Sequence, residues 1–165
     1  MRVLLRPLTA DDAEALVAYV AMATSAPARE QPPEEFAAQA RRWLENWTGR
    51  ELGIACEDEG QLVGAAWARV VDRVLARDPD TGAPLPELII AVAEHQRGAG
   101  LGHRLIDALM QLARTQGIAG LVLTVSERNP VAVRLYEQAG FRHAGDTPHG
   151  LGTMIWSTPC DDPMP

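Results

Sequence analysis

One stretch, residues 86–104, constrains the fold of this 165-residue chain more than any other. It begins with a short apolar run at residues 88–93, which predicts a buried strand. Gly98, Gly100 and Gly102 follow, and apolar residues then recur at helical spacing. A strand, a glycine loop and a helix N-terminus together form a phosphate-binding geometry, because unpaired N–H groups and the helix dipole point at one spot.

The glycine spacing separates several kinds of phosphate-binding loop. A Walker loop needs Gly-x-x-x-x-Gly-Lys-Ser/Thr, and the chain has no such run. A dinucleotide fingerprint would need a glycine at His103 and a carboxylate near residues 121–123, and both are missing. What remains is Arg-x-x-Gly-x-Gly, formed by Arg97, Gly100 and Gly102. For this loop alone, a strand–helix turn that binds no ligand stays an alternative.

A second strand–helix unit lies further along the chain. The apolar residues 121–125 predict a strand, and Asn129 with Pro130 predicts a helix start, since asparagine caps well and proline fits the first helical position. Gly140 is placed to end that helix, and Phe141 returns apolar surface to the core.

Together the two motifs, Arg-x-x-Gly-x-Gly and Asn-Pro-x-x-x-x-Leu-Tyr-x-x-x-Gly-Phe, resemble those of the GCN5-related N-acetyltransferases, the GNAT family. The resemblance covers residues 2–157, with sharp motifs only between 86 and 141. It implies acetyl-coenzyme A as cofactor and an N-acetyltransferase activity. The acetyl group would move from the thioester to a primary amine of a small molecule or peptide, by direct attack in a ternary complex. The middle of the chain also looks like a bacterial subgroup of the family.

The order of predicted elements, β-αα-β-β-β-α-β-α-β-β, matches the α/β (α+β) fold of that family. This fold has a mixed, strongly twisted sheet of about six to seven strands with helices on both faces. Residues 53–57 and 62–70 form a predicted hairpin, which disfavours a doubly wound fold. The second helix is expected to begin at Pro32. We expect a single domain over residues 1–158 and a disordered tail at 159–165.

By resemblance, main-chain N–H groups of the glycine loop hold the cofactor diphosphate, and its pantetheine arm pairs with the end of the preceding strand. The N–H of Val92 would face the thioester oxygen. Asn129 would touch the cofactor, although as a residue before a helix it is equally a plain N-cap. The expected cofactor-binding residues are Ala91, Val92, Ala93, Arg97, Gly98, Ala99, Gly100, Leu101, Gly102, Asn129 and Tyr136.

The resemblance also implies catalytic residues. Tyr136 is expected to protonate the leaving thiolate, with a packed core aromatic as the alternative. Glu87 is expected to take the amine proton, directly or through water, with a solvated strand-end charge as the alternative. Thr124 stands where some relatives carry a glutamate. Because that departure removes one base, an acyl-CoA sensor without turnover is the alternative function.

The acceptor amine is expected to enter from the face built by the two N-terminal helices and residues 71–85. Trp43, Trp47 and Trp67 either line that entrance or fill the core, and helical spacing favours the core. No metal site is expected, since two cysteines, Cys56 and Cys160, make neither a metal site nor a disulfide framework.

Composition sets the remaining expectations. A net charge of −7 argues against general nucleic-acid binding. For the glycine loop, a third hypothesis is that it binds the phosphate of a nucleotide other than coenzyme A. No apolar stretch reaches about 18 residues and no signal-like leader is visible, so the expectation is a cytoplasmic protein that does not enter a membrane. The sequence leaves open whether the chain forms a homodimer.

Overall fold

The computed structural model describes residues 3–24, 38, 41 and 44–159. The predicted second helix, which was expected to begin at Pro32 and to include Trp43, therefore lies mostly outside the described residues. The same holds for the predicted tail, apart from Pro159.

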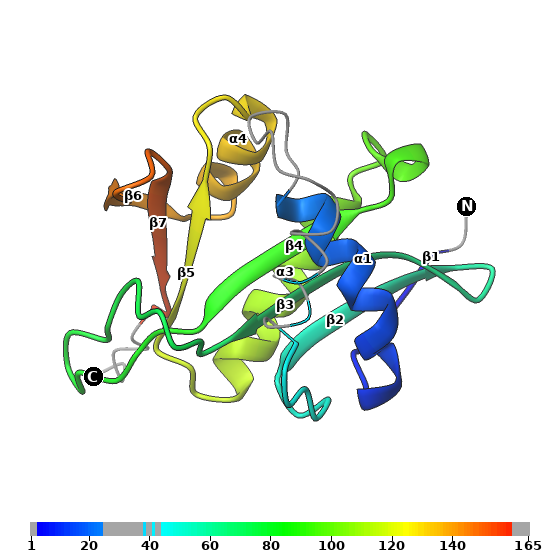
Figure 1. Cartoon of the computed structure of the whole chain (residues 1–165), viewed down its shortest axis with the longest axis horizontal. Helices are drawn as coiled ribbons and strands as arrows, with labels where there is room; N and C mark the ends of the chain where they lie inside the picture. Colours follow the sequence, from blue (N-terminus) through cyan, green and yellow to red (C-terminus); the bar gives the residue numbers. More distant parts are fainter. Residues whose placement is uncertain (1–2, 25–37, 39–40, 42–43, 160–165) are drawn as a thin grey trace, which may run out of the picture.

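One seven-stranded sheet organises the chain, with the order β1-β2-β3-β4-β5-β7-β6 (Figure 1). Every neighbouring pair is antiparallel except β4 and β5, which run parallel. This confirms the predicted mixed sheet of about six to seven strands. The strands are β1 (Val3–Pro7), β2 (Leu52–Asp58), β3 (Gln61–Arg69), β4 (Glu87–Val92), β5 (Gly120–Val125), β6 (Arg142–Asp146) and β7 (Gly152–Ser157).

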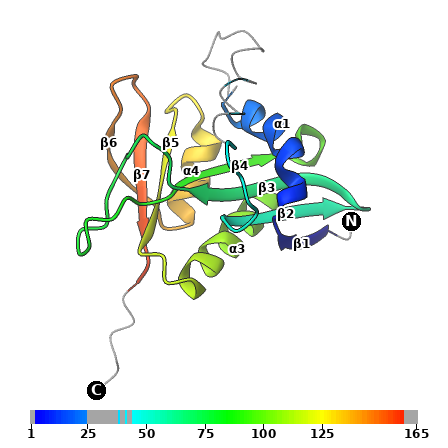
Figure 2. The same cartoon turned by 60° about the horizontal axis from the view of Figure 1, so that its bottom comes forward.

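The described helices cover both faces of the sheet (Figures 1 and 2). The α-helices are α1 (Ala13–Thr24), α3 (Leu101–Thr115) and α4 (Pro130–Gln138), and two 3₁₀ turns are η1 (Ala10–Asp12) and η2 (Glu94–Gln96). Helix α1 packs on β3 and β4, and α3 packs on β2, β3 and β4 from the other side. Each face has its own apolar core: Leu105 and Leu109 lie in the α3 core, and Leu16 and Trp67 in the α1 core.

Local signals fix the ends of the last helix as the sequence predicts. The Asn129 side chain accepts a hydrogen bond from the Ala132 N–H at 3.2 Å, and Pro130 occupies the first turn. Gly140 follows the helix with φ 96°, a left-handed angle that glycine adopts without strain. The predicted N-cap role of Asn129 is therefore confirmed.

Strands β4 and β5 diverge almost at once, and this opening positions the site. Their parallel pairing is limited to Glu87 opposite Val122, supported by a hydrogen bond from the Val122 N–H to the Pro86 oxygen at 3.0 Å. Beyond that point the two strands separate like the arms of a V (Figure 1). The arm formed by β4 leads directly into the glycine loop and α3.

Candidate active site

The inner edge of β4 presents main-chain polar groups to the opening between β4 and β5. The Ala93 N–H donates to the Val63 oxygen at 2.9 Å, so Ala93 belongs to the hydrogen-bonded pairs of the antiparallel β3–β4 ladder. Because such pairs alternate along a strand, Ala91 also bonds to β3, whereas the N–H groups of Ile90 and Val92 point away from β3. Two main-chain donors, at Ile90 and Val92, therefore face the V.

This register shows which main-chain N–H groups of the predicted cofactor contact can face the V. The Ala93 N–H is engaged in the sheet, and the alternation engages that of Ala91 as well, so neither is available to a ligand in the V. Ile90 was not predicted, although stepping two residues back from Val92 would have found it. A cofactor arm that enters from the glycine loop would pass Val92 first and Ile90 next.

The glycine loop leaves open space beside its backbone. Gly98 and Gly100 have φ angles of 79° and 76°, and a Cβ atom added at either would meet no heavy atom within 4 Å. These glycines are therefore needed for the left-handed backbone and not for packing against protein, and the space beside them is open. Arg97 is exposed, and its Nε donates to the Val92 oxygen at 3.4 Å, which ties the loop to the end of β4.

Gly102 has a different role from the other two glycines. A Cβ atom there would lie 3.3 Å from Leu135 of α4, so Gly102 allows α3 and α4 to approach each other closely. The His103 Nε2 and the Gln138 Oε1 lie 2.7 Å apart and join the same two helices. The loop is thus held against the helix that carries Tyr136.

Tyr136 lies in α4 with only 9% of its surface exposed, and its ring centroid is 5.9 Å from that of Phe141. Burial raises the pKa of the Tyr136 phenol well above its usual range. No hydrogen bond to its hydroxyl occurs within the described residues. The predicted core packing of Tyr136 is therefore present, and the hydroxyl keeps its proton at neutral pH.

Glu87 is buried, not solvated, so the alternative of a solvated strand-end charge was wrong. The residue is 5% exposed, and its Oε1 accepts a hydrogen bond from Arg73 Nη2 at 2.8 Å. Its Oε2 is buried and has no hydrogen-bond partner in the described part of the chain. Burial raises the pKa of the Glu87 carboxyl, and the Arg73 charge only partly opposes this.

Alternation along β4 places Glu87 on the face of the sheet that α1 covers, together with Ile89 and Ala91. Thr124 of β5 projects on this same side, since Leu123 and Val125 belong to the α3 core. Thr124 is half-buried. Glu87 and Thr124 therefore lie on the α1 side of the V, opposite to α3.

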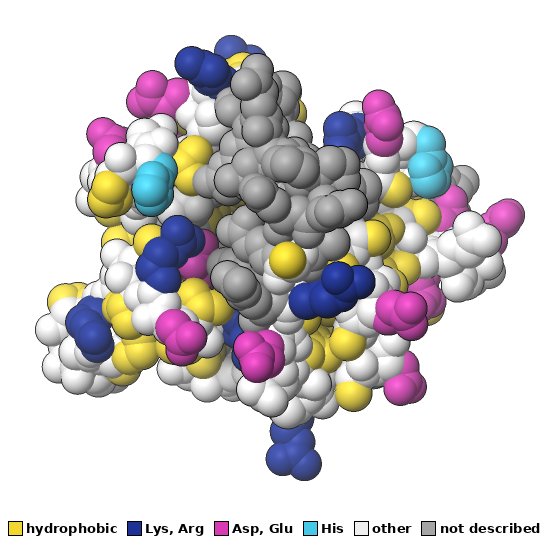
Figure 3. Space-filling view, in the orientation of Figure 1, with side chains coloured by type: hydrophobic (Ala, Val, Ile, Leu, Met, Phe, Trp, Pro, Cys, Tyr) yellow, Lys and Arg dark blue, Asp and Glu magenta, His cyan; other side chains and the backbone are white. Residues whose placement is uncertain are grey.

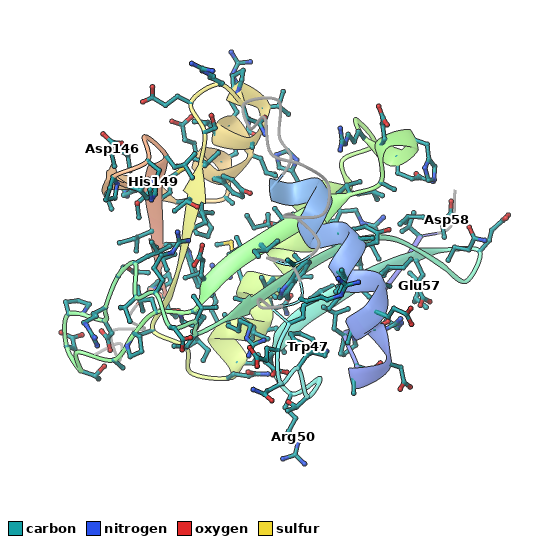
Figure 4. The ribbon with its side chains drawn as sticks, in the orientation of Figure 1. Trp47, Arg50, Glu57, Asp58, Asp146 and His149 are labelled. Carbon is teal, nitrogen blue, oxygen red and sulfur yellow. The ribbon has the colours of Figure 1, made fainter. Side chains whose placement is uncertain are left out.

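The tryptophans divide between core and edge. Trp67 is fully buried in the α1 core, which confirms the core alternative for this residue. Its Nε1 is buried without a hydrogen-bond partner among the described residues. Trp47 is half-buried, and its Nε1 donates to the Thr9 oxygen at 3.0 Å, so it joins the segment before β2 to the start of η1 (Figure 4).

Charged side chains are mixed on the face that Figure 3 shows. Dark blue and magenta groups alternate there, with apolar patches between them. No set of three or more His, Cys, Asp or Glu side chains that could hold a metal ion occurs in the described ranges. Within those ranges, no helix has the length and apolar character needed to cross a bilayer.

Comparison with known proteins settles the family. The model of the acetyltransferase (GNAT) family matches residues 15–141, which include both arms of the V, the glycine loop and Tyr136. The chain belongs to the GNAT family. The resemblance read from the two motifs and the acetyltransferase class are therefore confirmed at the level of the family.

Individual relatives agree with this assignment. The mycothiol acetyltransferase of Thermobispora bispora is 35% identical over 102 residues, which are 61% of this chain and 33% of the relative. The chain thus spans about a third of the length of that curated relative. A GCN5-related N-acetyltransferase from Kribbella flavida superposes with a TM-score of 0.71 at 25% identity, covering 94% of this chain and 98% of that one.

The cofactor of the family is acetyl-coenzyme A. A putative acetyltransferase from Salmonella typhimurium, yncA, was solved with its cofactor acetyl-CoA and has the same fold, with a TM-score of 0.66, 21% identity, and coverage of 95% of this chain and 94% of that one. The present GNAT chain fits such a group, because its glycine loop leaves open space beside two left-handed glycines and its β4 edge offers two N–H donors.

Proposed function

We propose that this GNAT domain transfers an acetyl group from acetyl-coenzyme A to a primary amine of a small molecule or peptide. The observation that carries the proposal is the continuous line of main-chain groups from the V to the glycine loop. Ile90 and Val92 offer N–H groups along β4, and Gly98 and Gly100 open the backbone at the start of α3. When bound, acetyl-CoA supplies an acetyl group activated as a thioester.

Cofactor binding would use the loop from one end and β4 from the other. The N–H groups of residues 97–102 and the positive end of the α3 dipole would hold the diphosphate, with the exposed Arg97 adding charge. Val92 would donate to an amide of the pantetheine arm, as an added strand does. Ile90, further into the V, would donate to the thioester oxygen and stabilise negative charge there, a role that the sequence led us to expect of Val92.

Tyr136 would serve as the acid. Its raised pKa keeps the phenol protonated at neutral pH, so a proton is available when negative charge develops on the sulfur. The family motif places a tyrosine at this position, and the contact of Gly102 with Leu135 holds α4 against the loop. Asn129, which is the N-cap of α4, would orient the start of the same helix beside the cofactor.

Glu87 would serve as the base. Its side chain leaves β4 on the α1 side, three residues before Ile90, which is about 10 Å along a strand. A carboxylate at that separation reaches the amine through water rather than directly. Because burial raises the pKa of Glu87, its carboxylate accepts a proton more readily than an exposed glutamate does.

The decisive test is product formation. Purified protein is incubated with acetyl-CoA and a panel of amines, and free thiol and N-acetylated product are measured together by a thiol reagent and mass spectrometry. Thiol release matched by acetylated amine supports the proposal. Binding of acetyl-CoA with no product on any amine would instead favour a sensor of acyl-CoA, the alternative that Thr124 motivates.

A further inference from the structure

We propose that Arg73 binds a carboxylate on the acceptor, so that the acceptor is an amine that also carries a carboxylate, such as an amino acid. This inference rests on the proposed function of the same site and deepens it. It concerns the segment between β3 and β4, residues 70–86, which belongs to neither sequence motif.

Arg73 is both anchored and available. Its Nη2 donates to the buried Glu87 Oε1 at 2.8 Å, yet 55% of the Arg73 side chain is exposed. The buried carboxylate therefore fixes one edge of the guanidinium and leaves its other donors toward solvent. A guanidinium oriented in this way is suited to bind a second carboxylate through two parallel hydrogen bonds.

The segment that carries Arg73 is built as an ordered arm. Arg77 and Pro84 form a β-bridge, the Leu85 N–H donates to the Ala76 oxygen at 3.0 Å, and the Asp78 N–H donates to the Ala83 oxygen at 2.8 Å. Leu85 is buried. In Figures 1 and 2 the arm extends beside β5 and β7. These main-chain bonds order residues 76–85, and the bond to Glu87 holds the Arg73 guanidinium before any ligand arrives, which lowers the entropic cost of binding.

The position of Arg73 beside the proposed base favours an anionic group on the acceptor, whereas the net charge of the chain opposes one. Glu87 lies on the α1 side of the V, where the amine would approach, so a group bound to Arg73 would lie close to the proposed base. The chain carries a net charge of −7, and its overall field therefore repels an anion. A fixed local cation is the feature that would select a carboxylate there.

The test compares amines that differ only by a carboxylate. Tyrosine is paired with tyramine and lysine with cadaverine, and each is titrated calorimetrically into the protein in the presence of coenzyme A. We expect the wild-type protein to bind the carboxylate-bearing member of a pair about tenfold or more tightly. Arg73→Gln removes this preference, and Arg73→Lys retains only part of it because lysine cannot form the bidentate pair.

Arg77→Gln is the matched control. It removes an arginine from the same arm, but Arg77 contacts the Gly82 oxygen and not Glu87, so the preference is retained. If Arg73 only supports Glu87, Arg73→Gln weakens both members of a pair equally and the inference is overturned. It is also overturned if the wild-type protein shows no preference or binds none of the carboxylates.

Thiol release in parallel samples, with acetyl-CoA in place of coenzyme A, separates the two proposals. If acetyl groups are transferred to both members of a pair equally, the proposed acetyltransferase activity is supported and the proposed role of Arg73 is overturned. If the carboxylate-bearing amine binds more tightly but no acetyl group is transferred, the role of Arg73 is supported and the acetyltransferase activity is overturned.

Discussion

The two sides of the V are built from different parts of the chain and from different chemical groups. The proposed cofactor side consists of main-chain N–H groups within one stretch, from β4 through the glycine loop into α3. The proposed acceptor side consists of side chains from separate segments, with Arg73 from the segment between β3 and β4, Glu87 from β4 and Thr124 from β5. A site built from the backbone of one stretch can therefore be found as a short sequence motif. A site assembled from side chains of separate segments has no continuous motif.

The largest effect should come from Tyr136, the proposed acid. Tyr136→Phe removes one hydroxyl from a packed ring and should lower kcat by about 10² to 10⁴-fold while leaving the KM for acetyl-CoA nearly unchanged. Steady-state thiol release measures both constants.

Tyr19→Phe is the control for that substitution. Tyr19 is also buried, but its hydroxyl donates to the Leu62 oxygen at 2.6 Å, so its loss should affect stability and not kcat. Equal kcat values for Tyr136→Phe and the wild-type protein would remove Tyr136 from the chemistry.

On the proposed acceptor side, Glu87→Gln should lower kcat by about 10²-fold, the lower end of the range for a general base, since the proposed proton path from the amine to Glu87 runs through a water. The base must be ionised, so in the wild-type protein kcat/KM should rise with pH through the raised pKa of Glu87. The Gln variant should lack this acidic limb. The pH dependence of kcat/KM is measured for both proteins. If the Gln variant keeps the acidic limb of the wild-type profile, a group other than Glu87 is the base.

The same substitution should not destabilise the protein at neutral pH. A carboxyl whose folded pKa is raised stabilises the fold below its unfolded pKa, and this contribution is lost as pH rises through the folded pKa. At neutral pH the ionised, buried Glu87 carboxylate lowers the free energy of unfolding, whereas a neutral glutamine at this position does not. Thermal unfolding should therefore show Glu87→Gln at least as stable as the wild-type protein at pH 7, with its advantage disappearing in acid.

On the cofactor side, Gly100→Ala should weaken acetyl-CoA binding by about tenfold, because the added methyl group enters the space proposed for the diphosphate and strains a left-handed residue. Gly82→Ala is the matched control, since Gly82 has a φ of 71° and similarly open surroundings but lies in the arm. Both should lose about 1 kcal/mol of stability. Calorimetry should show weaker binding only for Gly100→Ala, and equal affinities would argue against the loop as the phosphate site.

The smallest effect on activity should come from the ion pairs of β1, remote from the V. Arg6 donates to both Asp12 oxygens at 2.8 Å, and this contact lowers the pKa of Asp12 to about 2. Asp12→Asn should cost about 1 to 2 kcal/mol of unfolding free energy above pH 4, and the difference should vanish as pH falls toward 2. Chemical denaturation measures it, with the exposed Asp11→Asn as the control. A difference in unfolding free energy that does not change with pH would show that the ion pair of Asp12 with Arg6 is not its cause.

Much of the fold could be predicted because its signals are local. Pro130, Asn129 and Gly140 fix α4 through caps that involve only neighbouring residues. The alternation and turn signals likewise gave the hairpin of β2 and β3 within one residue at each end. The candidate site was predicted less completely. Ala91 and Ala93 were expected to bind the cofactor, but the pairing of β4 with β3 decides which N–H groups face the V.

The sequence by itself determined the glycine loop, the helix that follows it and the family to which the chain belongs, because these depend on backbone angles and caps set by adjacent residues. Only the tertiary structure decided that Glu87 is buried, that Arg73 is its partner and that Ile90 faces the opening. Burial and ion pairing depend on which distant segments meet, and β4 meets the arm and β5 only when the sheet has formed.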